Sequence, residues 1–223
     1  MNNNELEQLN SLLGNTQLLL SFSNDNGLFL THPDFLPLQV DFLSNKLQHR
    51  TKHSALSEMV AKACGAKHKP RVLDLTAGLG RDAYLLASLG CRVSMVERNP
   101  IMHALLKDGL RRLKIHDPLI ELSLLFQDSQ TLKSTDFDEN HFPQVIYIDP
   151  MHPHREKSAL VKKEMRILRD LVGDDYDKDN LLAHAFSMNA KKVVVKWPLK
   201  AILPIKRKPT GSIKGKSTRF DIF

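Results

Sequence analysis

The stretch that decides the fold runs from Val72 to Asp82 and reads Val-Leu-Asp-Leu-Thr-Ala-Gly-Leu-Gly-Arg-Asp. A short apolar run contains an acid, two glycines follow it, and a helical pattern begins at Asp82. Glycines in such a turn let the backbone approach a ligand, and the first N–H groups of the next helix face that ligand. The stretch therefore predicts a strand, a ligand-binding turn and a helix in succession.

The turn alone does not identify the ligand. A dinucleotide-binding turn has the spacing Gly-x-Gly-x-x-Gly, and Gly78, Gly80 and Ala83 do not exclude that pattern. Asp74 argues against it, because a carboxylate at the turn would repel a pyrophosphate but suits the ammonium group of an amino-acid-like ligand. A nicotinamide-dependent oxidoreductase remains an alternative interpretation, although Asp74 argues against it.

Short apolar runs alternate with helical patterns on either side of this stretch. We expect strands at 71–75, 92–97, 120–126, 144–148, 192–197 and 218–223, with the last at an edge. We expect helices at 53–63, 82–89, 100–113 and 157–171. Short strands separated by helices predict a doubly wound α/β sheet with parallel strands, and continuous apolar runs fit a sheet covered on both faces.

The first fifty residues follow another pattern. Helical spacing covers 5–13, two apolar runs at 18–22 and 28–31 flank a turn-rich segment, and a further strand is expected at 35–42. Pro37 favours an edge position for that strand, because proline cannot donate a ladder hydrogen bond. We interpret 1–51 as a small N-terminal β-rich appendage and 52–223 as the main domain.

Acids follow two more of the expected strands. Glu97 ends one strand 23 residues after Asp74, where a carboxylate can accept hydrogen bonds from both ribose hydroxyls of an adenosine ligand. Asp128 and Ser129 follow the strand at 120–126, where a carboxylate can accept from an adenine amino group. The simpler interpretations are a surface glutamate paired with Arg98 and an ordinary turn formed by Asp and Ser.

The most informative motif is Asp149-Pro150-Met151-His152-Pro153 after a buried strand. It resembles the [Asp/Asn/Ser]-Pro-Pro-[aromatic] signature of methyltransferases that modify exocyclic amines of bases. Such an amine is a poor nucleophile, because its lone pair is delocalised into the ring. The Asp149 carboxylate and the Pro150 carbonyl can accept its two protons, and the flat side chain of His152 can stack on the flipped base. We therefore assign Asp149, Pro150 and His152 as the catalytic residues; an ordinary strand-ending turn is the alternative.

The segment after this turn makes the resemblance more specific. Lys-Ser-Ala-Leu-Val-Lys-Lys-Glu-Met-Arg at 157–166, together with the turns at 74–82 and 149–154 and the closing Arg-Phe-Asp-Ile at 219–222, is similar to the ribosomal RNA small subunit methyltransferase J family over roughly 52–223. His152 departs from the Phe or Tyr expected in that family, so an imidazole ring would take the place of the aromatic ring that stacks on the base.

The resemblance implies a Rossmann-like class I methyltransferase sheet, S-adenosylmethionine as cofactor, and methyl transfer to N2 of a guanine near the 3′ end of 16S ribosomal RNA. The residues that the resemblance places in the cofactor pocket are Arg81, Asp82, Glu97, Arg98, Asp128, Ser129 and Asp149. With the turn residues Asp74, Gly78 and Gly80, they form the expected cofactor-binding set.

Charge is unevenly distributed along the chain. The formal net charge is +7, and residues 187–223 hold ten Lys or Arg against one acid, Asp221. A basic end on a nearly neutral body favours a polyanion partner, here the ribosomal RNA or the small subunit. Lys162, Arg166 and Arg169 would add a basic stripe on the helix at 157–171. A solvated surface explains both features without a ligand.

Several classes of protein fit less well. No apolar run is long enough for a membrane span, the N-terminus lacks a secretory pattern, and two cysteines without metal spacing suit a cytoplasmic protein. The scattered histidines predict no metal site. Methylation of an adenine or cytosine amine in RNA or DNA is the nearest rival, since the Asp-Pro turn serves any such amine. A non-catalytic RNA-binding module is disfavoured by the intact acids at 74, 97 and 149.

Overall fold

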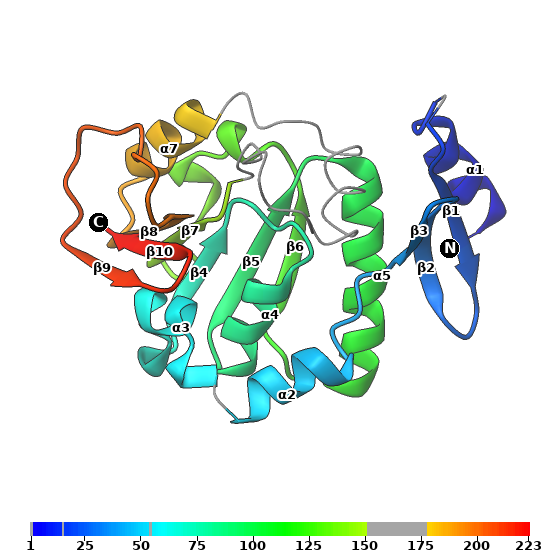
Figure 1. Cartoon of the computed structure of the whole chain (residues 1–223), viewed down its shortest axis with the longest axis horizontal. Helices are drawn as coiled ribbons and strands as arrows, with labels where there is room; N and C mark the ends of the chain where they lie inside the picture. The colour runs from blue at the N-terminus through cyan, green and yellow to red at the C-terminus, as the bar shows by residue number, and fades with distance from the viewer. Residues whose placement is uncertain (1, 15, 54, 151–177) are drawn as a thin grey trace.

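The computed structural model describes residues 2–14, 16–53, 55–150 and 178–223. Its centre is a seven-stranded sheet in the order β6-β5-β4-β7-β8-β10-β9 (Figure 1). The strands are β4 (Arg71–Asp74), β5 (Arg92–Glu97), β6 (Leu122–Phe126), β7 (Val145–Ile148), β8 (Lys192–Pro198), β9 (Gly211–Lys214) and β10 (Thr218–Ile222). β4 to β8 pair in parallel, whereas β10 is antiparallel to β8 and β9. The predicted α/β sheet is confirmed.

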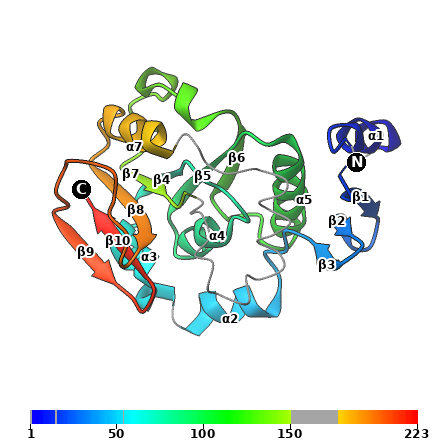
Figure 2. The ribbon, with the colours of Figure 1, turned by 45° about the horizontal axis from the view of Figure 1, so that its top comes forward.

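Successive side chains of the parallel strands enter two separate apolar cores. Val72 and Tyr147 belong to one core, and their neighbours Leu73 and Ile146 belong to the other. The helices on the first face are α3 (Met59–Cys64), α4 (Arg81–Ser88) and α5 (Pro100–His116), and α7 (Lys178–Ser187) covers the second. Figure 2 shows α4 and α7 on opposite sides of the sheet. Both faces are thus covered, as the apolar strands predicted.

Two expectations about the C-terminal and linker segments are wrong. The strand expected at the edge, β10, lies inside the sheet, because β9 pairs with it as a hairpin and forms the edge instead. β9 has one apolar residue, Ile213, so its pattern is weak. The single helix expected at 53–63 is wrong in its first half: α2 (Asn45–His53) ends where that helix should begin, 55–57 form the 3₁₀ turn η1 (Ala55–Ser57), and only α3 is an α-helix within the range.

The sequence pattern does not predict two of the helices, and one helix that it does predict lies outside the described residues. α2 has Leu47 as its one aliphatic residue, so it has no apolar stripe to predict, and α7 was not predicted either. Three short 3₁₀ turns, η2 (Ala66–His68), η3 (Ser129–Thr131) and η4 (Ser134–Asp136), lie between longer elements of the main sheet and its helices. The helix expected at 157–171 falls outside the described part of the chain. Among the described residues, no helix has the length and apolar content of a membrane span.

The N-terminal residues form a second, three-stranded antiparallel sheet with one helix beside it. The elements are α1 (Asn3–Ser11), β1 (Leu19–Ser23), β2 (Gly27–His32) and β3 (Phe35–Leu38). β3 lies at an edge, as its proline predicted. α1 begins with a capping box between Asn2 and Glu5. Figure 1 shows this sheet beside α5 at the right of the molecule.

One buried acid of α5 attaches the small sheet to the main domain. Asp108 accepts a hydrogen bond from the Leu28 N–H at 3.0 Å and from Arg111 and Arg112 at 3.1 and 3.0 Å. The Arg112 guanidinium also donates to the Val40 carbonyl. Burial would raise the pKa of Asp108, but these donors hold it below its ordinary value. The segment after β3 is therefore fixed against α5.

We predict that Asp108→Ala lowers the free energy of unfolding by about 1.5–3 kcal/mol, the value of hydrogen bonds to a charged acceptor. Because the folded pKa is depressed, the contribution is present above the unfolded pKa of about 4 and disappears as pH falls below it. Urea unfolding at pH 7 and at pH 3.5 measures both effects.

Glu121→Ala is the matched control. It removes an acid from an ion pair with Arg92 at 2.9 Å, in which both side chains are more than half exposed. Such a pair is worth less than about 1 kcal/mol. Equal losses of stability in the two variants would show that Asp108 does not attach the small sheet.

Candidate functional site

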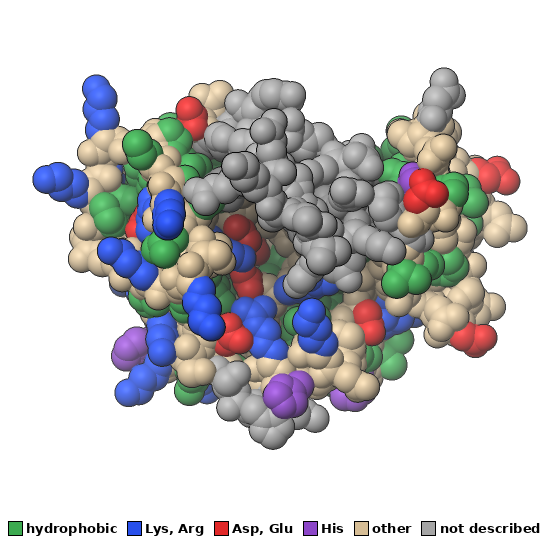
Figure 3. All heavy atoms as spheres, in the orientation of Figure 1, with side chains coloured by type: hydrophobic (Ala, Val, Ile, Leu, Met, Phe, Trp, Pro, Cys, Tyr) green, Lys and Arg blue, Asp and Glu red, His purple; other side chains and the backbone are tan. Residues whose placement is uncertain are grey.

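A cavity of about 730 Å³ opens at the carboxyl edge of the parallel strands. Its wall includes the turn after β4, the end of β5, the segment after β6, Asp149 after β7 and Lys196 of β8. Open α/β sheets hold ligands at this edge, and the volume is typical of cofactor sites. In Figure 3 acidic and basic side chains meet in a hollow in the middle of this face.

All residues predicted to bind the cofactor line this cavity except Gly80. They are Asp74, Gly78, Arg81, Asp82, Glu97, Arg98, Asp128, Ser129 and Asp149. They come together because all parallel strands end at the same edge of the sheet. A further part of the wall comes from the segment that the sequence assigned to the appendage: Gln39, Val40, Asp41, Ser44, Lys46, Leu47 and Arg50.

The two glycines of the first turn have different roles. Both have positive φ, 52° at Gly78 and 68° at Gly80. A Cβ atom at Gly78 would meet nothing nearer than the Thr76 carbonyl at 3.8 Å, so this glycine leaves open space at the cavity. A Cβ atom at Gly80 would lie 2.9 Å from the Phe42 ring. Gly80 is therefore required by core packing.

Thr76 connects the acids that follow β4 and β7. Its N–H donates to Asp74 Oδ1 at 2.9 Å, and its hydroxyl oxygen lies 3.2 Å from the same atom. The hydroxyl accepts from the Asp149 N–H at 2.7 Å. One side chain thus fixes the Asp74 carboxylate and the beginning of the Asp-Pro turn relative to each other.

Lys196 is the direct partner of Asp149. Its Nζ lies 2.6 Å from Asp149 Oδ2 and 3.2 Å from Asp82 Oδ2. β7 and β8 pair in parallel up to Ile148 and Val195, so Asp149 and Lys196 are the next residues on neighbouring strands. The side chains of Lys196 and Asp149 are 27% and 35% exposed, which leaves both accessible from the cavity.

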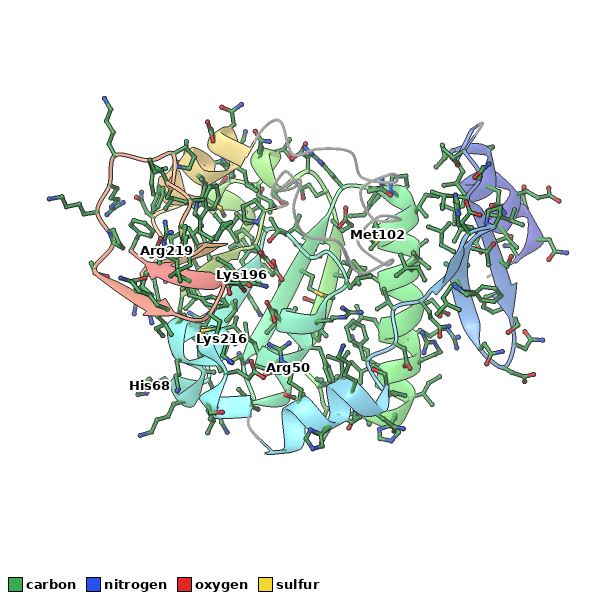
Figure 4. The ribbon with its side chains drawn as sticks, viewed as in Figure 1. Arg50, His68, Met102, Lys196, Lys216 and Arg219 are labelled. Carbon is green, nitrogen blue, oxygen red and sulfur yellow. The ribbon has the colours of Figure 1, made fainter. Side chains whose placement is uncertain are left out.

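Asp82 holds this pair from the first turn of α4. Its Oδ1 accepts from Arg50 at 3.1 Å, and its Oδ2 accepts from the Tyr147 hydroxyl at 2.8 Å. Arg50 also pairs with Glu58 at 3.0 Å. Figure 4 labels both cations, with Lys196 at the sheet and Arg50 on α2. The ion pairs therefore join α2, α4 and β8 to the turn after β7.

Burial and these partners shift the acidities in opposite directions. Burial raises the pKa of Asp74 to about 7, and the neighbouring carboxylates of Asp82 and Asp149 also raise it. Burial raises the pKa of Asp149, while the Lys196 ammonium opposes this change. Burial would raise the pKa of Asp82, but Lys196 and Arg50 lower it below its ordinary value. Burial would lower the pKa of Lys196, but Asp149 and Asp82 raise it.

The wall on the β5 side is built from Glu97 and the residues after β6. Glu97 is 9% exposed, and its Oε1 accepts from the Asn99 N–H at 2.7 Å. Asp128 accepts from the Gln130 N–H at 3.0 Å and from Arg98 at 3.3 Å. The Ser129 hydroxyl donates to the Leu75 carbonyl at 2.6 Å. Asp128 and Ser129 therefore form a turn and also line the cavity.

Sequence reasoning did not assign Thr76, Tyr147, Lys196 or Arg50 to the site. Lys196 could have been found, because it lies near the carboxyl end of an expected parallel strand. Arg50 belongs to a polar helix whose position the sequence does not indicate. Pro150 is buried beside Asp149 but does not line the cavity. His152 and the stripe of Lys162, Arg166 and Arg169 lie outside the described residues.

The wall fits S-adenosylmethionine chemically. Asp74 and Glu97 offer carboxylates for an ammonium group and for ribose hydroxyls, and Gly78 leaves space for close contact. A pyrophosphate fits poorly, because its charges would face Asp74 and Asp149. In the described part of the chain, no three His, Cys, Asp or Glu side chains are grouped as for a metal ion.

Comparisons with known proteins agree with this chemistry. The model of the SAM-dependent methyltransferase family matches residues 7–223. Ribosomal RNA small subunit methyltransferase J of Thioalkalivibrio sulfidiphilus is 45% identical over 218 residues, which cover 94% of this chain and 85% of that protein. The protein of the same name from Pseudomonas aeruginosa is 49% identical over 195 residues, covering 84% and 74%.

A solved structure supports the same assignment. The crystal structure of a SAM-dependent methyltransferase from Neisseria gonorrhoeae matches with a TM-score of 0.72 and 29% identity, covering 98% of this chain and 90% of that one. The match therefore extends over both the N-terminal sheet and the central sheet. On these similarities, the chain belongs to the ribosomal RNA small subunit methyltransferase J family of SAM-dependent methyltransferases.

Proposed function

We propose that this enzyme methylates the exocyclic N2 amine of a guanosine in 16S ribosomal RNA. The observation that carries the proposal is the Asp149 carboxylate, which lies at the carboxyl edge of the sheet in the same cavity as the acids suited to the cofactor. The names of the relatives describe methylation of small-subunit ribosomal RNA. The Asp-Pro turn favours an exocyclic amine as the target, because a carboxylate and a carbonyl there can accept the two protons of such an amine.

Three acids are proposed to hold the cofactor. Glu97 accepts from the ribose hydroxyls, Asp74 faces the ammonium group, and Asp128 accepts from the adenine amino group. Gly78 permits close approach of the ligand to the turn. Asp82, whose oxygens already accept from Arg50, Tyr147 and Lys196, positions its neighbours.

When bound, S-adenosylmethionine supplies an electrophilic methyl group, and the electrons of the broken carbon–sulfur bond pass to sulfur. Asp149 and the Pro150 carbonyl accept the two N–H groups of the target amine and favour its pyramidal, nucleophilic form. The nitrogen must lose one proton after it gains the methyl group. The raised pKa of Asp149 suits its carboxylate to accept that proton.

The RNA is proposed to lie on the basic C-terminal region. Of its ten cations, Lys192, Lys196 and Arg219 donate hydrogen bonds within the protein. The exposed ones are Lys191, Lys200, Lys206, Arg207, Lys208, Lys214 and Lys216. Figure 3 shows Lys and Arg side chains projecting from this side of the molecule, at the left. Phosphate contacts there would hold the strand while the target base is unstacked.

The function is tested by product identity. The protein is incubated with labelled S-adenosylmethionine and unmethylated 16S RNA or small subunits, and the nucleosides are analysed by mass spectrometry. We expect N2-methylguanosine as the product, and Asp149→Ala should lower the single-turnover rate by roughly 10²–10³-fold with little change in cofactor affinity. N6-methyladenosine or N4-methylcytidine would favour the rival amine targets, and a near-normal rate in the variant would rule out amine activation by Asp149.

Cofactor affinity should depend on pH through Asp74. With a pKa of about 7, this acid is ionised above pH 7 and loses its charge below it. The affinity should therefore fall about fivefold between pH 7 and pH 6, by proton linkage. Calorimetry from pH 6 to 7.5 measures it. Asp74→Asn should bind more weakly and lose this dependence; a variant that keeps the full pH slope would exclude Asp74 as its origin.

Neutralising Lys206, Arg207 and Lys208 to Gln should weaken RNA binding and leave cofactor affinity intact. Each lost phosphate contact reduces the salt slope of log K by about 0.7–0.9. Titrations at several salt concentrations measure both quantities. The control neutralises Lys62, Lys67 and Lys114, three exposed cations near the amino edge of the sheet, and removes the same charge. Equal effects of both triples would mean that net charge alone attracts the RNA.

A further inference from the structure

One N–H group of the Lys196 ammonium is available for a further hydrogen bond at the cavity. Of its three N–H groups, two are directed to Asp149 and Asp82. The third has no oxygen acceptor among the residues that the structure describes. Phe220 lies beneath the ammonium at 6.0 Å, at the outer limit of a cation–π contact. The side chain lines the cavity, so this N–H is available to a ligand.

Asp149 and Lys196 together present an ordered polar pattern. The two carboxylate oxygens are acceptors, and the ammonium 2.6 Å from Oδ2 is a donor, so the row reads acceptor, acceptor, donor. This spacing is close to that between adjacent polar atoms along the edge of a base. A guanine presents the complementary row, with donors at N2 and N1 and an acceptor at O6.

The other amine-bearing bases do not match this row. Adenine has a donor at N6 but an acceptor at N1, and cytosine has a donor at N4 followed by acceptors at N3 and O2. In either base, an acceptor lone pair would face a carboxylate oxygen of Asp149. An unmatched polar pair in a desolvated site disfavours binding strongly, as with base-edge recognition in general.

We propose that Lys196 is a specificity-determining residue, which donates a hydrogen bond to O6 of the target guanine while Asp149 accepts from N1 and N2. The inference rests on the proposed function, because it assumes that the target amine meets Asp149. Asp82 is the positioning residue, since its Oδ2 accepts the second hydrogen bond of the Lys196 ammonium at 3.2 Å. Arg50 and Tyr147 in turn hold Asp82.

The test uses synthetic RNAs that span the methylated guanosine and differ only in that nucleotide. Guanosine and 6-thioguanosine differ only in the acceptor at position 6. A second pair, 2-aminopurine and 2,6-diaminopurine, shares the N2 amine and an acceptor at N1 and differs only in a donor at position 6. Inosine, which lacks the N2 amine, is the control for the proposed function. Single-turnover methyl transfer is measured for each RNA.

We expect the wild-type enzyme to prefer guanosine over 6-thioguanosine, and 2-aminopurine over 2,6-diaminopurine, each by about tenfold. Lys196→Met has no donor and should bring both ratios to within about twofold of one. Lys196→Gln keeps a donor without the charge and should retain part of the preference. The matched control is Arg92→Met, which removes an exposed cation at the amino end of β5, away from the cavity, and should leave both ratios unchanged.

The outcomes separate the two proposals. Equal wild-type rates within each pair, or a Lys196→Met enzyme that is slower on all RNAs with unchanged ratios, would overturn the role of Lys196 in reading O6. Either result leaves guanosine methylation intact. Transfer to inosine as fast as to guanosine, or none to guanosine, would contradict the proposed function itself.

Discussion

Asp74, Asp82 and Asp149 bring three carboxyl groups to one edge of the sheet, where they would repel one another without cations between them. Lys196 and Arg50 supply those cations, one from β8 and one from α2. Because Lys196 pairs with two of the acids, neither can move without breaking a half-buried ion pair and leaving a charge without its partner. The shape of the site thus depends on charge pairing between elements distant in sequence.

The N-terminal sheet takes part in the same arrangement. Asp108 and Arg112 of α5 hold β2 and the Val40 carbonyl, and Gly109 allows this close approach, since a Cβ atom there would lie 2.6 Å from that carbonyl. The fixed segment continues into 39–50, which forms one wall of the cavity and carries Arg50. Residues 39–50 therefore complete one wall of the cavity that the ends of the parallel strands begin.

The sequence was sufficient for the parallel sheet and for nine of the residues that line the cavity, because both follow from local patterns and from the shared edge of parallel strands. It was not sufficient for contacts that depend on strand order. Lys196 reaches Asp149 only because β8 lies next to β7, an adjacency that no local pattern records. The expected edge position of β10 is wrong for a different reason. β9, the strand that forms the edge instead, has too few apolar residues to be recognised in the sequence.

A cation beside the acid that is proposed to bind the target amine looks unfavourable at first, since it competes for the same oxygens. An Asp149 without this cation would be less suited to accept a hydrogen bond from an amine. Without Lys196, burial and the Asp82 charge would raise the pKa of Asp149 further and favour its protonated form. A protonated carboxyl would offer a donor where the target amine needs an acceptor. The Lys196 ammonium opposes this rise in the pKa of Asp149 and favours the ionised carboxylate. Each carboxylate oxygen has a second lone pair, so the proposed contacts with the ammonium and the base can form together.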